Sequence, residues 1–188
     1  MLSTTMAHAA ANSSIARGRS RAPEVPTIRA IAFQSGGYEF ALPMAVVVKV
    51  THCPPLQSTE WQRAGLVYVD RQLIQVMDLG LLLGSADRPL ELTDQFLAIA
   101  RAGSALCGIP TDRPPDSIDL PRDRVQPLPA QFERSPLSRL AECAVVLAPD
   151  SAPRTIFLLN LRQALAWANE VAHPPRPGNL EHSGTPGN

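Results

Sequence analysis

The amino-acid sequence predicts an all-β fold in which two small barrels share a hydrophobic core. Its apolar runs are short and bounded by turn residues, as is typical of strands. The chain contains 19 prolines, and each disfavours a long helix because it lacks a backbone N–H and clashes with the preceding turn. Two clusters of predicted strands, within about 28–84 and 95–160, indicate the two barrels.

The first half of the fold shows the alternation of apolar and polar residues expected of strands. In YEFAL, Tyr38, Phe40 and Leu42 fall on one face because strand side chains alternate. Gly36 and Gly37 precede this run and predict a hairpin turn. The predicted elements are strands at 28–34, 38–42, 45–50, 66–70 and 72–78, a loop at 51–62, a tight turn at Arg71, and a helical turn at 79–83 closed by Gly84.

The second half adds strands and the one good amphipathic helix pattern. Strands are predicted at 96–100, 105–109, 142–148 and 155–161, followed by a helix at 161–171 with Leu161, Leu165 and Ala168 on one face. The proline-rich stretch 112–129 is predicted to be a loop. Its aspartates indicate a solvated segment rather than a calcium site, because prolines interrupt them and the EF-hand glycine and glutamate are absent.

The two ends of the chain are predicted to be disordered tails. Residues 1–27 and 172–188 are rich in small, polar, Gly or Pro residues, so the folded domain is expected at 28–171, with subdomains at about 28–90 and 91–160. The first tail lacks the apolar stretch of a secretory signal, although its Ser and Arg content also fits an organelle transit peptide. No apolar run approaches the roughly 20 residues of a membrane span. We expect a cytoplasmic protein without direct membrane insertion.

Charge and cysteine usage exclude several classes of partner and cofactor. The 17 basic and 17 acidic side chains cancel, so no overall field favours nucleic acid or an anionic bilayer. Cys53, Cys107 and Cys143 are far apart and form no Cys-x-x-Cys pair, which predicts neither a disulfide framework nor a zinc site. A reducing compartment, no metal and no cofactor are the simplest expectations.

No arrangement of residues predicts catalysis. The chain has no Gly-x-Ser-x-Gly elbow and no Cys/His pair at a plausible spacing. Asp78 in MDLG comes nearest to a catalytic carboxylate, but a lone carboxylate more often caps a turn by accepting backbone N–H bonds. Gly36 and Gly37 join two strands, whereas a phosphate loop needs a strand-to-helix turn. The sequence therefore predicts that the protein is not an enzyme.

Several segments, taken in order, carry a family resemblance. GGYEFALPMAVVVKV looks like an opening hairpin, and GLVYVDRQLIQVMDLGLLLG like a strand, hairpin and Val-apolar-Asp-Leu block. FLAIARAGSALCGIPTD, VQPLP and TIFLLNLRQAL look like later strands, a proline-bearing loop and a closing strand with its helix. In this order, from Phe33 through Leu165, the chain resembles the CheW-like family of chemotaxis coupling proteins. The resemblance implies two intertwined, SH3-like, five-stranded barrels with a shared core and no active site.

The resemblance also implies a function. It indicates a non-catalytic adaptor that couples the cytoplasmic tips of chemoreceptors, the methyl-accepting proteins, to the regulatory domain of a CheA-type histidine kinase. The pathway would be chemotaxis or pilus motility, and the place the cytoplasm, at membrane-associated receptor arrays. An alternative stays open: a divergent β-barrel module that binds a peptide or small ligand without kinase coupling.

The chain departs from the family pattern where function is expected. Lys49 stands where the family usually has an acidic residue, and Tyr68, Val69, Asp70 and Arg71 replace Asn-Leu-Arg-Gly. Loss of one member of an interfacial charge pair costs about 2 to 5 kcal/mol, so a standard partner should bind poorly. A paired swap of the two charges, Glu to Lys and Arg to Asp, could however preserve the attraction between them while changing which partner protein is bound. We therefore expect a specialised member of the family.

Six residues are the candidate partner-binding residues, although apolar strand residues are first of all candidates for the core. Trp61, in a polar loop, is a possible anchor because Trp is enriched at binding hot spots. Charged residues beside a strand face are normally solvated or interfacial. The partner-binding set is Val47, Lys49, Trp61, Tyr68, Asp70 and Arg71. The core candidates are Val47, Val50, Val67, Val69, Val76, Leu106 and Ile109, of which a minority would line a groove between the barrels.

Overall fold

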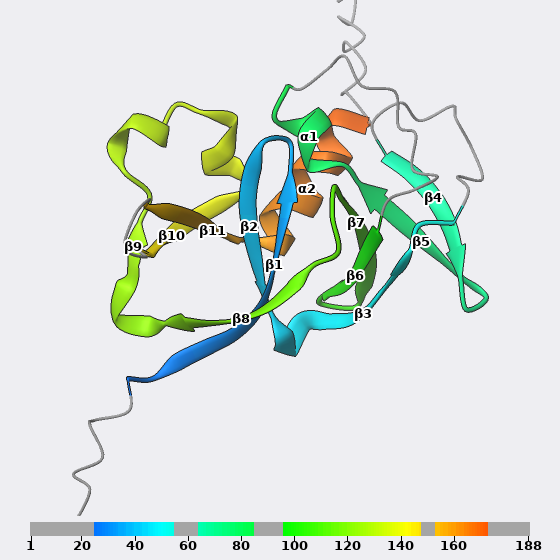
Figure 1. The fold of residues 1–188 in the computed structure, drawn as a ribbon. Helices are drawn as coiled ribbons and strands as arrows, with labels where there is room; N and C mark the ends of the chain where they lie inside the picture. The colour runs from blue at the N-terminus through cyan, green and yellow to red at the C-terminus, as the bar shows by residue number, and fades with distance from the viewer. Residues whose placement is uncertain (1–24, 55–63, 85–95, 148–152, 173–188) are drawn as a thin grey trace, which may run out of the picture.

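The computed structural model describes residues 25–54, 64–84, 96–147 and 153–172, which form a mostly β fold (Figure 1). The strands are β1 (Thr27–Ser35), β2 (Tyr38–Pro43), β3 (Val47–His52), β4 (Ala64–Val69), β5 (Gln72–Met77), β6 (Phe96–Ala102), β7 (Ala105–Thr111), β8 (Asp116–Pro121), β9 (Val125–Pro127), β10 (Ala141–Leu147) and β11 (Arg154–Leu159). The helices are α1 (Leu79–Leu82) and α2 (Leu161–Ala172). Short 3-10 turns occur at Met44–Val46, Arg122–Arg124, Ala130–Phe132 and Pro136–Arg139.

The strands form two mixed sheets. Sheet A has the order β8-β1-β2-β11-β10-β9, and sheet B has the order β3-β6-β7-β5-β4. Both repeat one pairing pattern, in which two antiparallel hairpins are joined by a parallel step: β2 with β11 in sheet A, and β7 with β5 in sheet B. The predicted fold class is confirmed, although local patterns did not reveal the two parallel steps.

The chain passes between the sheets twice. After β1 and β2 it crosses at Met44–Val46, builds sheet B from β3 to β7, and returns after Thr111 to complete sheet A with β8 to β11. Sheet A therefore takes its described strands from both ends of the fold and sheet B takes its strands from the middle, whereas the sequence suggested subdomains at about 28–90 and 91–160. The first hairpin finds its parallel partner, β11, near the far end of the chain, because parallel strands cannot be joined by a tight turn.

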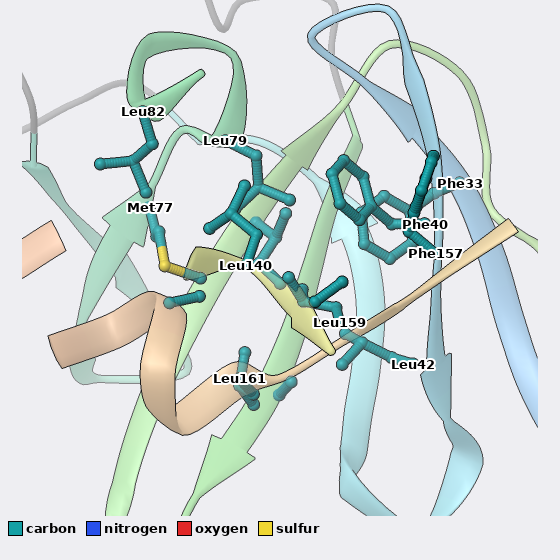
Figure 2. Packing of buried hydrophobic residues seen from close by; sticks show 14 of the residues in the cluster. Phe33, Phe40, Leu42, Met77, Leu79, Leu82, Leu140, Phe157, Leu159 and Leu161 are labelled. Atoms are coloured by element: carbon teal, nitrogen blue, oxygen red, sulfur yellow. The ribbon is translucent and has the colours of Figure 1, made fainter. Parts of the chain in front are cut away.

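A shared core lies between the two sheets, as predicted. Along β2, Phe40 faces this shared core while its neighbour Ala41 faces a separate cluster within sheet A. Along β6, Ala98 faces the shared core while Leu97 faces a separate cluster within sheet B. Both faces of these central strands are therefore buried. Figure 2 shows the shared core, with Phe33, Phe40 and Phe157 grouped on one side and Met77, Leu79 and Leu82 on the other.

Helix α1 holds the end of β5 against the β1–β2 turn. Oδ1 of Asp78 accepts hydrogen bonds from the backbone N–H groups of Gly80, at 2.8 Å, and Leu81, at 3.2 Å, which confirms the predicted cap. Gly36, at a φ of 60°, approaches this helix so closely that a Cβ on it would stand 2.8 Å from the Cα of Gly80. The β1–β2 turn of sheet A and the helix that follows β5 of sheet B thus meet backbone to backbone.

Helix α2 buries its apolar face in the shared core. Oδ1 of Asn160 accepts a hydrogen bond at 3.2 Å from the backbone N–H of Gln163 and so caps the first turn. Of the three residues predicted on the apolar face, Leu165 is half-buried against the core. The buried residues of the helix are Leu161, Ala164, Trp167 and Ala168.

Polar contacts fix the other end of α2 to both sides of the molecule. Nε2 of Gln75, in β5, donates a hydrogen bond at 2.7 Å to Oδ1 of Asn169. Arg139, before β10, pairs with Glu170, and its guanidinium lies 4.7 Å from the ring centroid of Trp167. Gln75 lies in a strand of sheet B, and Arg139 lies just before a strand of sheet A. Helix α2 therefore ties the two sheets together.

Two strands occupy the stretch predicted to be a loop. β8 pairs antiparallel with β1, and β9 pairs with β10, so the aspartates at 116 and 119 lie on an edge strand rather than in a loop. The prolines that suggested a loop are compatible with these positions, since edge strands tolerate a missing N–H donor. With β9 included, sheet A has six strands instead of the expected five.

Candidate functional site

The two edge strands of sheet B are joined by an ion pair. β3 and β4 lie at opposite ends of the sheet, yet Nζ of Lys49 in β3 lies 2.5 Å from Oδ2 of Asp70, directly after β4. The sheet must therefore curl until its ends meet. Because the Asp70 side chain is 77% exposed, the pair contributes no more than about 1 kcal/mol to stability. Its main effect is to position the β4–β5 hairpin relative to β3.

A β-bulge turns Lys49 toward Asp70. Val47 pairs with Ala100 and Lys49 pairs with Ile99, which leaves Val48 as an extra residue in β3. Ala100 belongs to the shared core and Ile99 to the inner cluster of sheet B, so the bulge sends Val47 and Lys49 to opposite faces. Without it, side chains two apart would share a face.

The turn beside this ion pair is strained. Val69 pairs with Gln72, so Asp70 and Arg71 are the two central residues of the hairpin turn, and their φ angles are 51° and 64°. Positive φ at both positions is the pattern of a type I′ turn, which favours Asn or Asp followed by Gly. Asp tolerates this conformation, whereas Arg adopts it at a cost of about 1 to 2 kcal/mol. The predicted tight hairpin is confirmed, and its turn contains no glycine.

The outer face of the hairpin exposes two large apolar side chains directly opposite each other. Tyr68 in β4 pairs with Leu73 in β5, and they are 56% and 52% exposed. The neighbours Val67 and Val69 point inward and are buried, as predicted. The sequence did not single out Leu73, because its importance depends on the register of β4 against β5. Once both Asp70 and Arg71 are assigned to the turn, the register of the hairpin places Tyr68 opposite Leu73.

The edge strand β3 carries a second group of exposed apolar side chains. Val48 is 49% exposed and Val50 is 39% exposed, and Met44 in the preceding turn is also exposed. Val50 was expected in the core, and this expectation is wrong. Among the described strands, β3 pairs only with β6, so none of them covers Val50 from the other side. The other core candidates are buried or half-buried.

The structure brings four of the six candidate residues to the hairpin and separates a fifth. Lys49 reaches Asp70 from the inner side of sheet B, next to Arg71, while Tyr68 points from the outer side. Val47 is half-buried against the shared core instead. The sixth candidate, Trp61, lies outside the described residues.

Reactive groups are scarce in the part of the chain that the structure describes. No cluster of three or more potential metal-ligating side chains occurs there. Burial raises the pKa of the Cys53 thiol to about 11 and that of Cys107 to about 12, so both stay protonated at neutral pH and are poor nucleophiles. None of the described helices is long and apolar enough to cross a membrane.

Comparisons with known proteins identify the family. The model of the CheW-like domain matches residues 29–168, well over half of the chain. A search of curated protein sequences found no match. Among solved structures, the chain is similar to the scaffolding protein TtCheW from Thermoanaerobacter tengcongensis, with a TM-score of 0.59 and 16% sequence identity over 74% of this chain and 92% of that chain. That likeness shows a shared fold of two SH3-like subdomains. The chain therefore belongs to the CheW-like family of non-catalytic scaffold domains.

Proposed function

We propose that this protein is an adaptor that holds the regulatory domain of a CheA-type histidine kinase and the cytoplasmic tip of a chemoreceptor in one complex. Membership in the CheW-like family supports this, and the outward pair of Tyr68 and Leu73 is the observation in this chain that carries it. Scattered single apolar residues are normal on a surface. Two large ones opposite each other indicate an interface, especially since Tyr is enriched at such sites.

An adaptor needs a second surface, and the other edge of sheet B offers one. Val48 and Val50 lie on β3, an edge strand whose outer backbone groups have no strand beside them among the described residues. Exposed edges of this kind can accept a partner. The ion pair between Lys49 and Asp70 stands between the two surfaces and holds them in a defined relation.

Binding of the two purified partners tests the proposal. We expect the wild-type protein to bind an immobilised kinase regulatory domain and a receptor-tip fragment in surface plasmon resonance. Tyr68→Ser should weaken one of the two by at least about tenfold, since a buried aromatic hot spot is worth about 2 kcal/mol or more.

The control for this test is Val146→Ser. Val146 is 40% exposed on β10, in the other sheet, and its loss should leave both affinities unchanged. Wild-type protein that binds neither partner would defeat the coupling role. Binding that is unaffected by Tyr68→Ser would remove the hairpin from the interface.

The reversed charges provide a second test, which separates the adaptor from the alternative function. The double variant Lys49→Glu with Asp70→Arg restores the usual order of charges and keeps their attraction. Because an arginine at the positive φ of position 70 costs about 1 to 2 kcal/mol, its stability should fall by about that amount. We expect it to gain affinity for the kinase or receptor of a standard CheW pathway. The single variants, which place like charges together, should show no such gain. If the double variant also gains no affinity for these partners, the result would favour a barrel that binds a peptide or small ligand without kinase coupling.

We place the adaptor in the cytoplasm, at membrane-associated receptor arrays, because the receptor tip and the kinase would both be found there. Flagellar chemotaxis and pilus motility are the two candidate pathways. The identity of the neighbouring genes would distinguish them.

A further inference from the structure

The tip of the β4–β5 hairpin carries an arginine in a conformation that destabilises the fold. Arg71 has a φ of 64°, in the left-handed region that a residue with a side chain adopts only under strain. The second central position of a type I′ turn favours glycine, and the family pattern Asn-Leu-Arg-Gly has glycine there. The chain therefore keeps a long side chain at a position where glycine would relieve the strain.

Within the described parts of the chain, no contact of the Arg71 side chain compensates for this strain. The side chain is exposed, and it forms no hydrogen bond, ion pair or ring contact with a described residue. The neighbouring carboxylate of Asp70 is already paired with Lys49, so the hairpin tip keeps a net positive charge. By contrast, Arg139 and Arg154 each pair with a glutamate. Backbone strain of this kind is concentrated at functional sites.

Exposed apolar side chains stand beside this charge. Tyr68 and Leu73 lie opposite each other on the same hairpin, two residues before and two residues after the nearer turn position or its neighbour. A partner that covers this pair removes water from the hairpin tip, and a guanidinium there must then be paired to avoid a buried, uncompensated charge. Guanidinium groups bind carboxylates in a bidentate geometry. The complementary surface is therefore apolar with an aspartate or glutamate beside it.

We propose that Arg71 is a specificity-determining residue, which binds a carboxylate on the regulatory domain of the kinase. In Figure 1 the turn between β4 and β5 projects from the edge of the molecule, and a projection is best buried by a recess in a folded domain. The receptor tip is itself a projecting end, so the kinase domain fits the hairpin better. The inference rests on the proposed function, because the kinase is one of its two partners. It adds a contact that a glycine at this position does not provide.

Three substitutions of Arg71 separate its charge from its strain. Arg71→Gln removes the charge but keeps a long side chain at positive φ, so its midpoint of urea unfolding should stay near that of the wild type. Arg71→Glu keeps the strain and reverses the charge. Arg71→Gly relieves the strain, so its midpoint should rise, although the greater freedom of glycine in the unfolded chain offsets part of the gain. The matched control is Arg124→Gln, at an exposed arginine on the 3-10 turn Arg122–Arg124, which forms no ion pair with a described residue.

Surface plasmon resonance measures the binding of each full-length variant to the immobilised kinase regulatory domain and to the receptor-tip fragment. We expect Arg71→Gln and Arg71→Gly to bind the kinase domain about tenfold more weakly, and Arg71→Glu about thirtyfold or more, because it places two like charges together. The affinity for the receptor tip should stay within about twofold, and Arg124→Gln should change neither affinity. Arg71→Gly is the sharpest case, because a variant that is more stable yet binds more weakly cannot owe its loss to unfolding.

The outcomes separate this inference from the adaptor role. If the kinase domain binds every Arg71 variant as tightly as the wild type, Arg71 does not determine specificity and the adaptor role stands. If Arg71→Gln and Arg71→Glu lose affinity equally, the group on the kinase is not a carboxylate. A loss confined to the receptor tip overturns the assignment to the kinase, and a lower unfolding midpoint in Arg71→Gly would show that the arginine serves the fold instead. If the wild type binds neither partner, the adaptor role and this inference both fail.

Discussion

Gly36→Ala is expected to lower the free energy of unfolding by about 3 kcal/mol or more. Two costs add. The φ of 60° places an alanine in the left-handed region, at about 1 to 2 kcal/mol. The new Cβ would also stand 2.8 Å from the Cα of Gly80, which is backbone and cannot rotate away; overpacking of this kind costs about 1 to 3 kcal/mol. Urea unfolding followed by circular dichroism measures the total.

Gly37→Ala is the matched control, because it introduces the same side chain one residue later in the same turn. Its φ is 82°, but no heavy atom beyond the adjacent residues of the chain lies within 4 Å of the added Cβ. We therefore expect only the conformational cost of about 1 to 2 kcal/mol. Equal losses in the two variants would mean that the close approach of the β1–β2 turn to α1 contributes nothing to stability.

Phe157→Ala is expected to cost about 3 to 5 kcal/mol, the usual range for removing a buried phenylalanine. Phe157 lies at the centre of an aromatic cluster, with ring centroids 5.8 Å from Tyr38, 6.2 Å from Phe40 and 5.7 Å from Phe132. It also pairs with Phe40 in the parallel step between β2 and β11. The substitution thus removes packing where the first and last hairpins of the chain meet. Thermal and urea unfolding both report the loss.

Phe157→Leu serves as the control for this position. It retains most of the buried volume and loses the edge-to-face contacts, which are worth about 0.5 to 1.5 kcal/mol each beyond their area. We expect a loss of about 1 to 2 kcal/mol. A leucine variant as unstable as the alanine variant would show that ring geometry, rather than filled volume, holds the two hairpins together.

A salt bridge also joins β2 and β11 at the surface. Arg154, at the start of β11, binds both carboxylate oxygens of Glu39 in β2, and this hydrogen bonding raises the pKa of the Arg154 guanidinium above its usual value. The pair lies on the strands that form the parallel step of sheet A. The glutamate was recognised from the sequence only as the residue opposite the apolar face of β2.

Part of the candidate site could be predicted from local sequence. The charges at Lys49 and Asp70 differ from the family pattern in opposite senses, which suggested a paired swap, and the structure places their side chains in contact. The bulge at Val48 that permits this contact could not be predicted, because it depends on the register of β3 against β6.

The sequence by itself determined the features that depend on neighbouring residues. Alternation assigned the faces of β2, the glycine pair predicted the first hairpin turn, and Asp78 was recognised as a helix cap, because turn chemistry and strand periodicity act within a few residues. Only the tertiary structure decided the parallel steps, the two crossings between sheets and the strands β8 and β9. These depend on which distant strands bury their apolar faces together. A strand's own pattern shows that it needs a partner, but not which strand that partner is.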